Sequence, residues 1–328
     1  MKTGKLSGQE LEEIILTTLN RKRDDVLVYP AVGEDCAVID FGEEVLIVST
    51  DPITGAVAGI GRLAVNISCN DIAASGGEPV GIQLLILAPP SLGKSDLTRI
   101  MTDVELEAAR QQIDVLGGHT EVTSAVNQLI ISTTAIGRAP RNRYVAANGA
   151  RPGDDILITK GIGLEGAAIL ALDHKEELLK RGVSKDTIEK AGSYLAEMSV
   201  VAEGLLCAEF GVHAMHDVTE GGLLGGVWEL AYAAGLGFEL ERAAIPVLRP
   251  VAEICQKLGL DPLLLISSGT MLVVTDQGKE LQAVLKAGGI EAAIIGQMRE
   301  DGYILHDRGT SKQLKPPFQD ELWRWLGR

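Results

Sequence analysis

The chain has 328 residues, of which 46% are hydrophobic, 23% charged and 4% aromatic. This composition is that of a globular protein, and the length suits two α/β domains. The formal net charge is −15 and no dense stripe of lysine and arginine occurs, so nucleic acid is not an expected partner. No apolar run is long enough for a signal segment or a membrane span, so we expect a cytoplasmic protein without membrane contact.

The first half is predicted to mix strands and helices. Ser7 and Glu10 form a capping box for a helix that we expect to end near the basic residues 21–23. Asp51 and Pro52 are expected to stop the second strand, and a glycine pair at 117–118 to break the fourth. The strands are expected over 32–39, 44–50, 79–88, 114–122 and 128–137, and the further helices over 60–75 and 95–113.

A turn cluster at 151–154 is the predicted boundary between a first domain, 1–150, and a second, 151–328. A short helix is expected in the tail, around Trp323. Neither half shows strict strand–helix alternation, so the predicted fold class is α+β layering in each domain. The second-half strands are expected over 155–159, 212–215, 270–275, 292–295 and 303–306, and the helices over 164–180, 186–210 and 220–234.

Three aspartates of the first half stand at junctions and not on a solvent face of a helix. Asp35 lies in GEDCA, Asp51 ends a β-branched run, and Asp71 follows Asn66 and Asn70 on an otherwise apolar helix. Buried carboxylates are costly unless they are paired or bind metal, and Mg²⁺ takes one or two carboxylates together with phosphate oxygens. The set therefore predicts Mg²⁺ held against a triphosphate. Turn or cap roles remain open for each aspartate, least so for Asp71.

Glycine-rich junctions supply candidate phosphate contacts. Gly117 and Gly118, before His119 and Thr120, would let backbone amides approach an anion, although a β-bulge or hairpin corner is the alternative. Residues 159–166 read TKGIGLEG and contain G-x-G-x-x-G, which also fits a dinucleotide site. Such a site needs a second strand that ends in an acidic residue, and the sequence that follows predicts no such strand. The P-loop pattern is absent, and a lysine before the glycines favours a phosphate contact.

The segment 215–223, MHDVTEGGL, runs from a strand into a helix. Asp217 ends the strand, Thr219 can cap the helix, and Gly221 and Gly222 leave the helix N-terminus open. The N-terminus of a helix attracts anions. This segment is therefore a further candidate site for a phosphate with its metal ion.

Cysteine and histidine spacing predicts neither a zinc site nor a disulfide framework. The cysteines form no CxxC pair and are expected to be buried as small hydrophobic residues. His213 and His216 lack a third ligand at a suitable spacing. The four cysteines are Cys36, Cys69, Cys207 and Cys255.

The motifs resemble, in their order along the chain, the aminoimidazole ribonucleotide synthetase (PurM-like) superfamily, which includes thiamine-phosphate kinase, selenophosphate synthetase and HypE. They are GEDCAVI, STD, NDIAASGGEP, GGHTE, TKGIGLEG, DVTEGGL and SSGTML. The segments around Lys160 and Asp217 look closest to HypE, whereas His119 looks more like selenophosphate synthetase. The resemblance implies two α/β domains and a homodimer in which the first domains pair in a β-barrel, with ATP in a cleft along the dimer.

The resemblance also implies roles for individual residues. The Mg²⁺ carboxylates would be Asp35, Asp51, Asp71 and Asp217, and the catalytic residues Asp71 and Lys160. The residues that contact ATP would be Asp35, Asn66, Gly117, Gly118, Thr120, Gly161, Gly163, Thr219, Gly221 and Gly222.

The expected activity is that of an ATP-dependent phosphotransferase or synthetase. Its acceptor would be a small molecule or a carbonyl or carboxamide group. A non-catalytic nucleotide-binding scaffold, with a protein partner in a maturation pathway, is one alternative, and a dinucleotide-dependent oxidoreductase is another. HypE acts on its own C-terminal cysteine, whereas the last cysteine here is Cys255. The same chemistry at the C-terminal tail is therefore not expected, and the substrate stays open.

Overall fold

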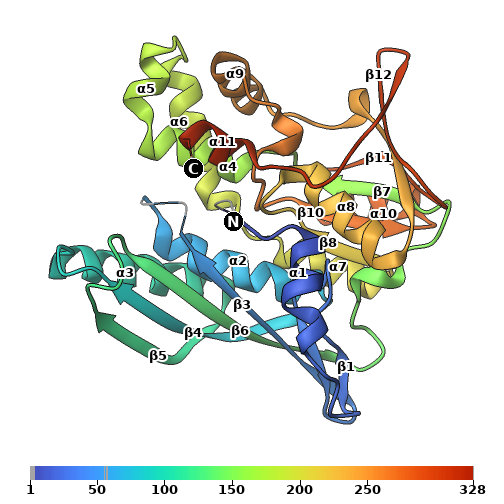
Figure 1. The fold of residues 1–328 in the computed structure, drawn as a ribbon, viewed down its shortest axis with the longest axis horizontal. Coiled ribbons are helices and arrows are strands. Elements are labelled where there is room, and N and C mark those ends of the chain that lie inside the picture. The colour runs from blue at the N-terminus through green and yellow to red at the C-terminus, as the bar shows by residue number, and fades with distance from the viewer. Residues whose placement is uncertain (1–3, 55, 57, 328) are drawn as a thin grey trace.

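The computed structural model describes residues 4–54, 56 and 58–327. Two halves each contain a β-sheet with helices packed on it, and the long helix α2 lies between them (Figure 1). The predicted mixture of helices and sheets in two domains is confirmed. The position of the boundary at 150/151 stays a prediction. Within the described part of the chain, no helix is long and apolar enough to cross a membrane.

The first half forms a six-stranded sheet in the order β1-β2-β3-β6-β4-β5, antiparallel except for the parallel pair β4–β5. Helices α2 and α3 pack on one face of it (Figure 1). The strands are β1 Val26–Val28, β2 Ala37–Asp40, β3 Glu44–Ile53, β4 Glu78–Ala88, β5 Asp114–Val122 and β6 Ile130–Pro140. The helices are α1 Gly8–Ile14, α2 Ile60–Ala74 and α3 Lys94–Gln111.

Several boundaries of the first half differ from the prediction, two of them at residues that the sequence singled out. The capping box of Ser7 is present, but α1 ends at Ile14 and only a short 3₁₀ turn follows. Strand β3 continues through Asp51 and Pro52, because β2 pairs only with residues 45–48 and leaves that edge of β3 open beyond them. Proline is tolerated on such an edge because it has no N–H to donate.

Strand β5 also differs from its prediction, because the glycine pair does not break it. It runs without a break from 114 to 122, with a shift of register against β4 between Val115 and Gly117. Gly117 and Gly118 adopt φ of 146° and 145°. The alternative of a β-bulge therefore describes this segment.

The second half forms a seven-stranded sheet in the order β13-β12-β9-β11-β7-β10-β8, antiparallel except for the pair β12–β9. The strands are β7 Asp155–Thr159, β8 Ala214–Asp217, β9 Gly237–Glu241, β10 Met271–Thr275, β11 Ala292–Arg299, β12 Tyr303–Asp307 and β13 Thr310–Gln313. The helices are α4 Leu164–Asp173, α5 Lys175–Lys180, α6 Lys185–Ser193, α7 Val201–Phe210, α8 Gly222–Ala234, α9 Arg249–Leu258, α10 Gly278–Ala287 and α11 Glu321–Leu326.

The second half contains more elements than the sequence predicted. The two long helices expected over 164–180 and 186–210 are each divided, at His174 and at the 3₁₀ turn 194–197. The structure adds β9, α9, α10 and β13, whereas the tail helix, α11, was expected. Strand β7 has the predicted bounds.

The two halves share a packed boundary along α2, in which every residue except Arg62 is buried. Asn70 accepts a hydrogen bond from Val200 N and donates one to Met198 O, both in the segment before α7. A Cβ on Gly204 of α7 would lie 2.4 Å from Ala73 O, so glycine allows the two helices to cross closely. This boundary positions residues of both halves around one cavity.

Candidate functional site

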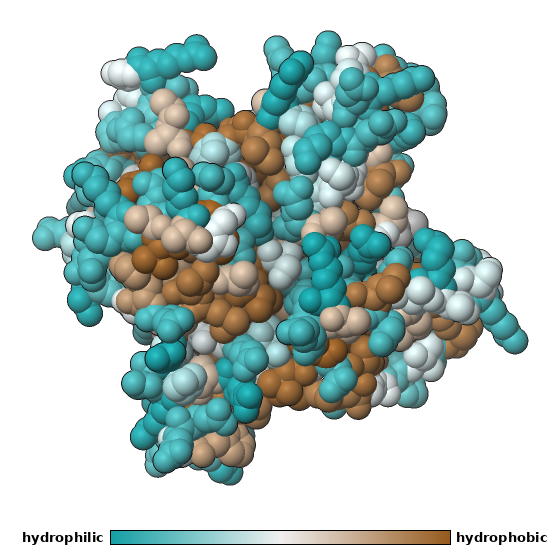
Figure 2. All heavy atoms as spheres, turned by 180° about the vertical axis from the view of Figure 1, so that it is seen from behind, coloured by the Kyte–Doolittle hydropathy of each residue, from teal (hydrophilic) through white to brown (hydrophobic). Residues whose placement is uncertain are grey.

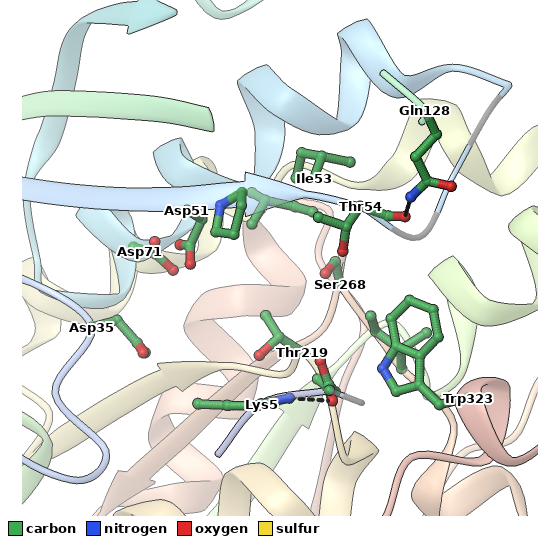
Figure 3. A pocket seen from close by; sticks show the side chains of 15 residues that line it. Lys5, Asp35, Asp51, Ile53, Thr54, Asp71, Gln128, Thr219, Ser268 and Trp323 are labelled. Atoms are coloured by element: carbon green, nitrogen blue, oxygen red, sulfur yellow. Dashed lines mark hydrogen bonds between the residues drawn. The ribbon is translucent and has the colours of Figure 1, made fainter. Parts of the chain in front are cut away.

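A cavity of about 480 Å³ lies where β3 and α2 face the N-terminal segment, the start of α8 and the tail helix (Figure 3). The segments that line it are far apart in the sequence. Its lining residues are Gly4, Lys5, Asp35, Asp51, Pro52, Ile53, Thr54, Ile67, Asp71, Gln128, Thr219, Glu220, Ile266, Ser268 and Trp323.

Three carboxyl groups predicted from the sequence line this cavity. Asp35 lies in the loop before β2, Asp51 near the end of β3, and Asp71 on the buried face of α2 (Figure 3). Ser49 Oγ donates to Asp71 Oδ2 at 2.5 Å. Burial raises the pKa of the Asp71 carboxyl well above its usual range, and the negative charges of Asp51 and Asp217 raise it further.

The fourth predicted carboxyl, Asp217 at the end of β8, lies behind the cavity wall and is fully buried. Neither of its side-chain oxygens has a hydrogen-bond partner among the residues that the structure describes. Burial raises its pKa to about 7, with Asp35 adding to the shift and His216 opposing it. An unpartnered buried carboxylate is costly unless it is protonated or paired with a cation.

Two cationic side chains balance part of this negative charge. His216 Nε2 lies 3.2 Å from Asp35 Oδ2 and 3.3 Å from Glu229 Oε2, and Lys5 Nζ lies 2.7 Å from Glu229 Oε1. Burial alone would lower the pKa of His216, but Asp35 and Glu229 raise it to about 10. Burial alone would raise the pKa of Glu229, but Lys5 and His216 lower it to about 2. With no metal bound, these carboxylates therefore favour the protonated form of His216.

Asp35, His216 and Asp217 each offer a possible ligand atom, and these atoms lie within 4.8 Å of one another. The two carboxylates are hard oxygen ligands, and His216 can ligate only as the neutral imidazole. Oxygen ligands of this kind suit Mg²⁺. His213, the other histidine considered for zinc, instead pairs with Asp154 at 2.8 Å. The donor set and the unpartnered oxygens of Asp217 fit a hard divalent cation.

Three predicted residues at the start of α8 are close to the cavity, but only Thr219 lines it. Gly221 N donates to Asp320 Oδ2 of the tail at 2.8 Å, and Gly222 N donates to Thr219 O. The helix N-terminus is therefore partly occupied by a carboxylate of the same chain, as expected from its dipole.

Several other predicted residues are not brought to the cavity within one chain. Asn66 is buried and bonds to Gln111 and to Arg62 O. Gly117, Gly118 and Thr120 lie on the exposed edge strand β5. None of these residues lines the cavity within the part of the chain that the structure describes.

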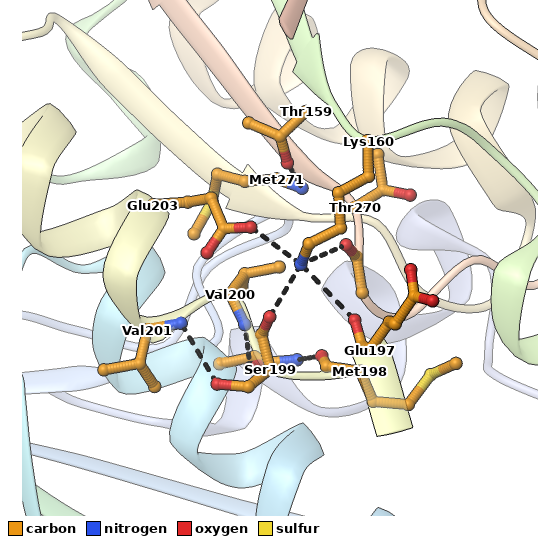
Figure 4. Close-up of polar contacts among 12 residues, drawn as sticks. Thr159, Lys160, Glu197, Met198, Ser199, Val200, Val201, Glu203, Thr270 and Met271 are labelled. Carbon is orange, nitrogen blue, oxygen red and sulfur yellow. Dashed lines mark hydrogen bonds and ion pairs between the residues drawn. The ribbon is translucent and has the colours of Figure 1, made fainter. Parts of the chain in front are cut away.

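Lys160 is also placed apart from the cavity, because its ammonium is held by the protein itself (Figure 4). Its Nζ lies 2.7 Å from Glu203 Oε1 and donates to the carbonyl oxygens of Ser199, Gly269 and Glu197 at 2.7, 3.0 and 3.3 Å. An ammonium has only three donors, so these partners leave none to spare for a phosphate.

The loop that follows Lys160 also uses its amides internally. Gly163 N donates to Ser267 Oγ at 2.7 Å, and Ile162 N donates to Pro246 O. Thr270 Oγ1 donates to Gly161 O. These bonds give the loop a structural role and argue against the dinucleotide interpretation.

Several side chains of the cavity were not singled out from the sequence for a site. Lys5, Ser268 and Trp323 reach the cavity from the N-terminal segment, the loop before β10 and the tail. SSGTML had marked the segment of Ser268 as a family motif. No local pattern in the sequence predicts that Lys5 and Trp323 meet at one cavity.

Comparison with known proteins places both halves in one family. The model of the N-terminal domain of AIR synthase related proteins matches residues 33–139, and that of the C-terminal domain matches residues 151–307. The hydrogenase expression/formation protein HupE of Azotobacter chroococcum is 30% identical, over 91% of this chain and 86% of its own.

Two HypE proteins are similar over most of their length. The carbamoyl dehydratase HypE of Azotobacter vinelandii is 29% identical, over 96% of this chain and 89% of its own. The crystal structure of HypE from Escherichia coli superposes with a TM-score of 0.74 at 27% identity, covering 85% of this chain and 88% of that one.

Proposed function

The chain belongs to the AIR synthase related proteins, with HypE-like relatives, and on this premise we propose that it is an enzyme that binds ATP with Mg²⁺ in the cavity. It would transfer a phosphoryl group to an oxygen of a small molecule or of a carboxamide-type group. The fold and the order of the motifs support this activity. They do not identify the acceptor, which depends on the residues that line the cavity of this chain.

The observation that carries the proposal is the meeting of carboxylates from separate segments. Asp35, Asp51 and Asp71 line one cavity, and Asp217 lies behind it with both oxygens unpartnered within the described chain. Burial raises the pKa of Asp71, and the negative charges of Asp51 and Asp217 raise it further. Bound cations would relieve this repulsion, and Mg²⁺ brings phosphate oxygens with it.

Bound Mg²⁺ would neutralise charge on the transferred phosphoryl group, which is the main requirement of this chemistry. The residues of the chain would then have separate tasks. Asp35, Asp51, Asp71 and Asp217 would hold the metal, His216 would keep Asp35 and Asp217 in place, and Lys5 would face the phosphates. We assign Lys160 to the support of the site and not to contact with ATP, because its donors are all used.

A second copy of the chain would bring further predicted residues to the nucleotide. The first sheet has an outer face with exposed hydrophobic side chains, including Leu85 and Leu116. Figure 2 shows hydrophobic residues gathered in the lower part of the molecule, where Figure 1 has the first sheet. We propose that two copies pair through this sheet as a homodimer, and that Gly117, Gly118 and Thr120 act there.

A second candidate is a maturation protein that binds nucleotide and works with a protein partner. The names of the similar proteins, which describe hydrogenase expression and formation, favour it. Rapid ADP release with a small acceptor would exclude a purely non-catalytic form of this role.

Calorimetry with Mg²⁺ and the non-hydrolysable analogue AMPPCP tests the proposal. Wild type should bind the analogue, and EDTA should weaken the binding strongly. Asp71→Asn should lose at least tenfold in affinity, because it removes a metal ligand without changing volume. Asp301→Asn, at an exposed turn, is the matched control and should bind as wild type does. Absence of binding by wild type, or full binding by Asp71→Asn, contradicts the proposed site.

A further inference from the structure

Glu229 of α8 lies beside two cationic side chains, although it is not among the residues that line the cavity. Its Oε1 accepts a hydrogen bond from Lys5 Nζ at 2.7 Å, and its Oε2 lies 3.3 Å from His216 Nε2. His216 Nε2 is also 3.2 Å from Asp35 Oδ2, and it makes no hydrogen bond within the described chain, so charge attraction relates these groups. One carboxylate thus connects the N-terminal segment to an aspartate of the proposed metal site.

The position of Glu229 is fixed by the packing of its helix. The residue is only 8% exposed. A Cβ on Gly33, which has a φ of 85°, would lie 2.7 Å from Glu229 O, so the loop that carries Asp35 lies directly on the helix backbone. The side chain of Lys5, in contrast, is 43% exposed and has many rotamers. In this ion pair the carboxylate is therefore the fixed partner and the ammonium the movable one.

The N-terminal segment is held on α8 by further contacts that do not involve the carboxylate of Glu229. A Cβ on Gly8 would lie 2.7 Å from the indole of Trp228, so the segment passes close to that ring. The hydroxyl of Tyr232 donates to Glu12 Oε2 at 2.7 Å. The segment should therefore stay on the helix when Glu229 is changed. What the carboxylate determines is the direction of the lysine side chain.

Lys5 has other possible partners if Glu229 is removed. Asp35 and Asp51 line the same cavity, and their charges already act on the Lys5 ammonium. An ammonium that pairs with these two carboxylates would compete with Mg²⁺ for them, because each carboxylate favours a nearby positive charge. The contact with Glu229 prevents this competition.

We propose that Glu229 is a positioning residue of the nucleotide site, which holds the Lys5 ammonium beside the phosphates and away from the carboxylates that bind Mg²⁺. It touches neither the nucleotide nor the metal, and it acts through Lys5 and, by way of His216, through Asp35. The inference rests on the proposed function, and it adds the residue that directs the basic side chain of that site.

Calorimetry with AMPPCP at saturating Mg²⁺ distinguishes positioning from a simple effect of charge. Glu229→Gln removes a negative charge near a triphosphate, so charge alone predicts tighter binding. Positioning predicts binding that is weaker by about threefold or more, because a glutamine offers one acceptor oxygen in place of two. Tighter or unchanged binding by the folded variant would overturn the inference.

The same change in a Lys5→Met background shows whether the effect passes through the lysine. Residues that act through one another give non-additive effects, so Lys5→Met/Glu229→Gln should bind AMPPCP within about twofold of Lys5→Met. Two losses that multiply would indicate a general structural effect and contradict the proposal. Glu12→Gln is the matched control, because it also removes a negative charge from a side chain that contacts α8 and keeps an acceptor for Tyr232. It should bind as wild type does.

Glu229→Asp keeps the test decisive if Glu229→Gln does not fold. It retains the charge but withdraws it by one methylene from the ammonium, so charge alone predicts no change. Positioning again predicts a loss of about threefold or more, and unchanged binding contradicts it. Absence of AMPPCP binding by wild type would defeat the nucleotide site and this inference with it. Binding by wild type together with unchanged variants would defeat only the role of Glu229.

Discussion

Lys160 Nζ lies 2.7 Å from Oε1 of Glu203, and this ion pair joins the end of β7 to the first turn of α7. The side chain of Glu203 is 4% exposed, so removal of the lysine leaves a buried negative charge. We expect Lys160→Met to lower the free energy of unfolding by about 3 kcal/mol in urea denaturation. Lys175→Met, at an exposed position, should have no effect.

The same pair allows a double-mutant cycle. If the loss in Lys160→Met comes from the unpaired charge, Glu203→Gln should restore part of the stability when the two changes are combined. AMPPCP affinity should change less than twofold in any of these variants that folds. A large loss of nucleotide affinity at full stability would instead support a phosphate contact by Lys160.

The pH dependence of stability should depend in part on Glu165. Burial raises its pKa to about 7, so the folded chain keeps a proton that the unfolded chain has already lost between about pH 4.5 and 7. Stability should therefore fall as the pH rises through this window. Glu165→Gln should match wild type near pH 4.5 and exceed it by on the order of 2 kcal/mol at pH 8.

Denaturation at the two pH values measures this difference, with the exposed Glu189→Gln as the matched control. Asp320, whose pKa burial also raises to about 7, should leave some pH dependence in the variant. Equal slopes for wild type and Glu165→Gln would show that the carboxyl does not carry the effect.

Lys5 should contribute to nucleotide affinity through its charge. It is the basic side chain of the described cavity lining, and Asp35 and Asp51 as well as Glu229 help to raise its pKa against the effect of burial. Lys5→Met should weaken AMPPCP about tenfold, equivalent to about 1.4 kcal/mol, and the loss should shrink at high salt. Calorimetry at two salt concentrations checks this, with exposed Lys312→Met as control. An unchanged affinity would remove Lys5 from the site.

The crossing of α2 and α7 should not tolerate a side chain at Gly204. A Cβ there would lie 2.4 Å from Ala73 O, a backbone atom that cannot move away cheaply. Gly204→Ala should destabilise the protein by about 2 kcal/mol in spite of the better helix propensity of alanine. Gly192→Ala in α6 meets only the side chain of Leu172, at 3.2 Å, and should be neutral or stabilising by up to about 1 kcal/mol. Thermal unfolding of both variants tests the contrast.

The sequence predicted elements best where an apolar run left little choice. Strand β7 and helix α2 have bounds at or within one residue of the prediction, because each is buried over nearly its whole length. The prediction that Pro52 stops the strand was wrong, because β3 has an open edge beyond Val48 where proline is tolerated. That edge is open because β2, the strand beside it, pairs no further than Val48. Edge position is a tertiary property and leaves no local pattern.

The candidate site was predictable in part for a similar reason. Asp35, Asp51 and Asp71 stand at junctions or in an apolar helix, which the sequence shows. Lys160 also stands at a junction, but its left-handed φ of 56° turns the chain so that its ammonium meets Glu203, and no residue pattern signals this. The approach of Lys5 and Trp323 joins segments more than 300 positions apart, which only the folded chain brings together.

Both ends of the described chain lie beside the cavity, since Lys5 and Trp323 line it. An affinity tag or fluorescent fusion joined at either end would follow directly on a segment that lines the cavity. A polyhistidine tag could then capture the divalent ion or cover the entrance, and titrations on tagged protein would report the tag. Cleavage of the tag is therefore a condition for every binding measurement on this protein.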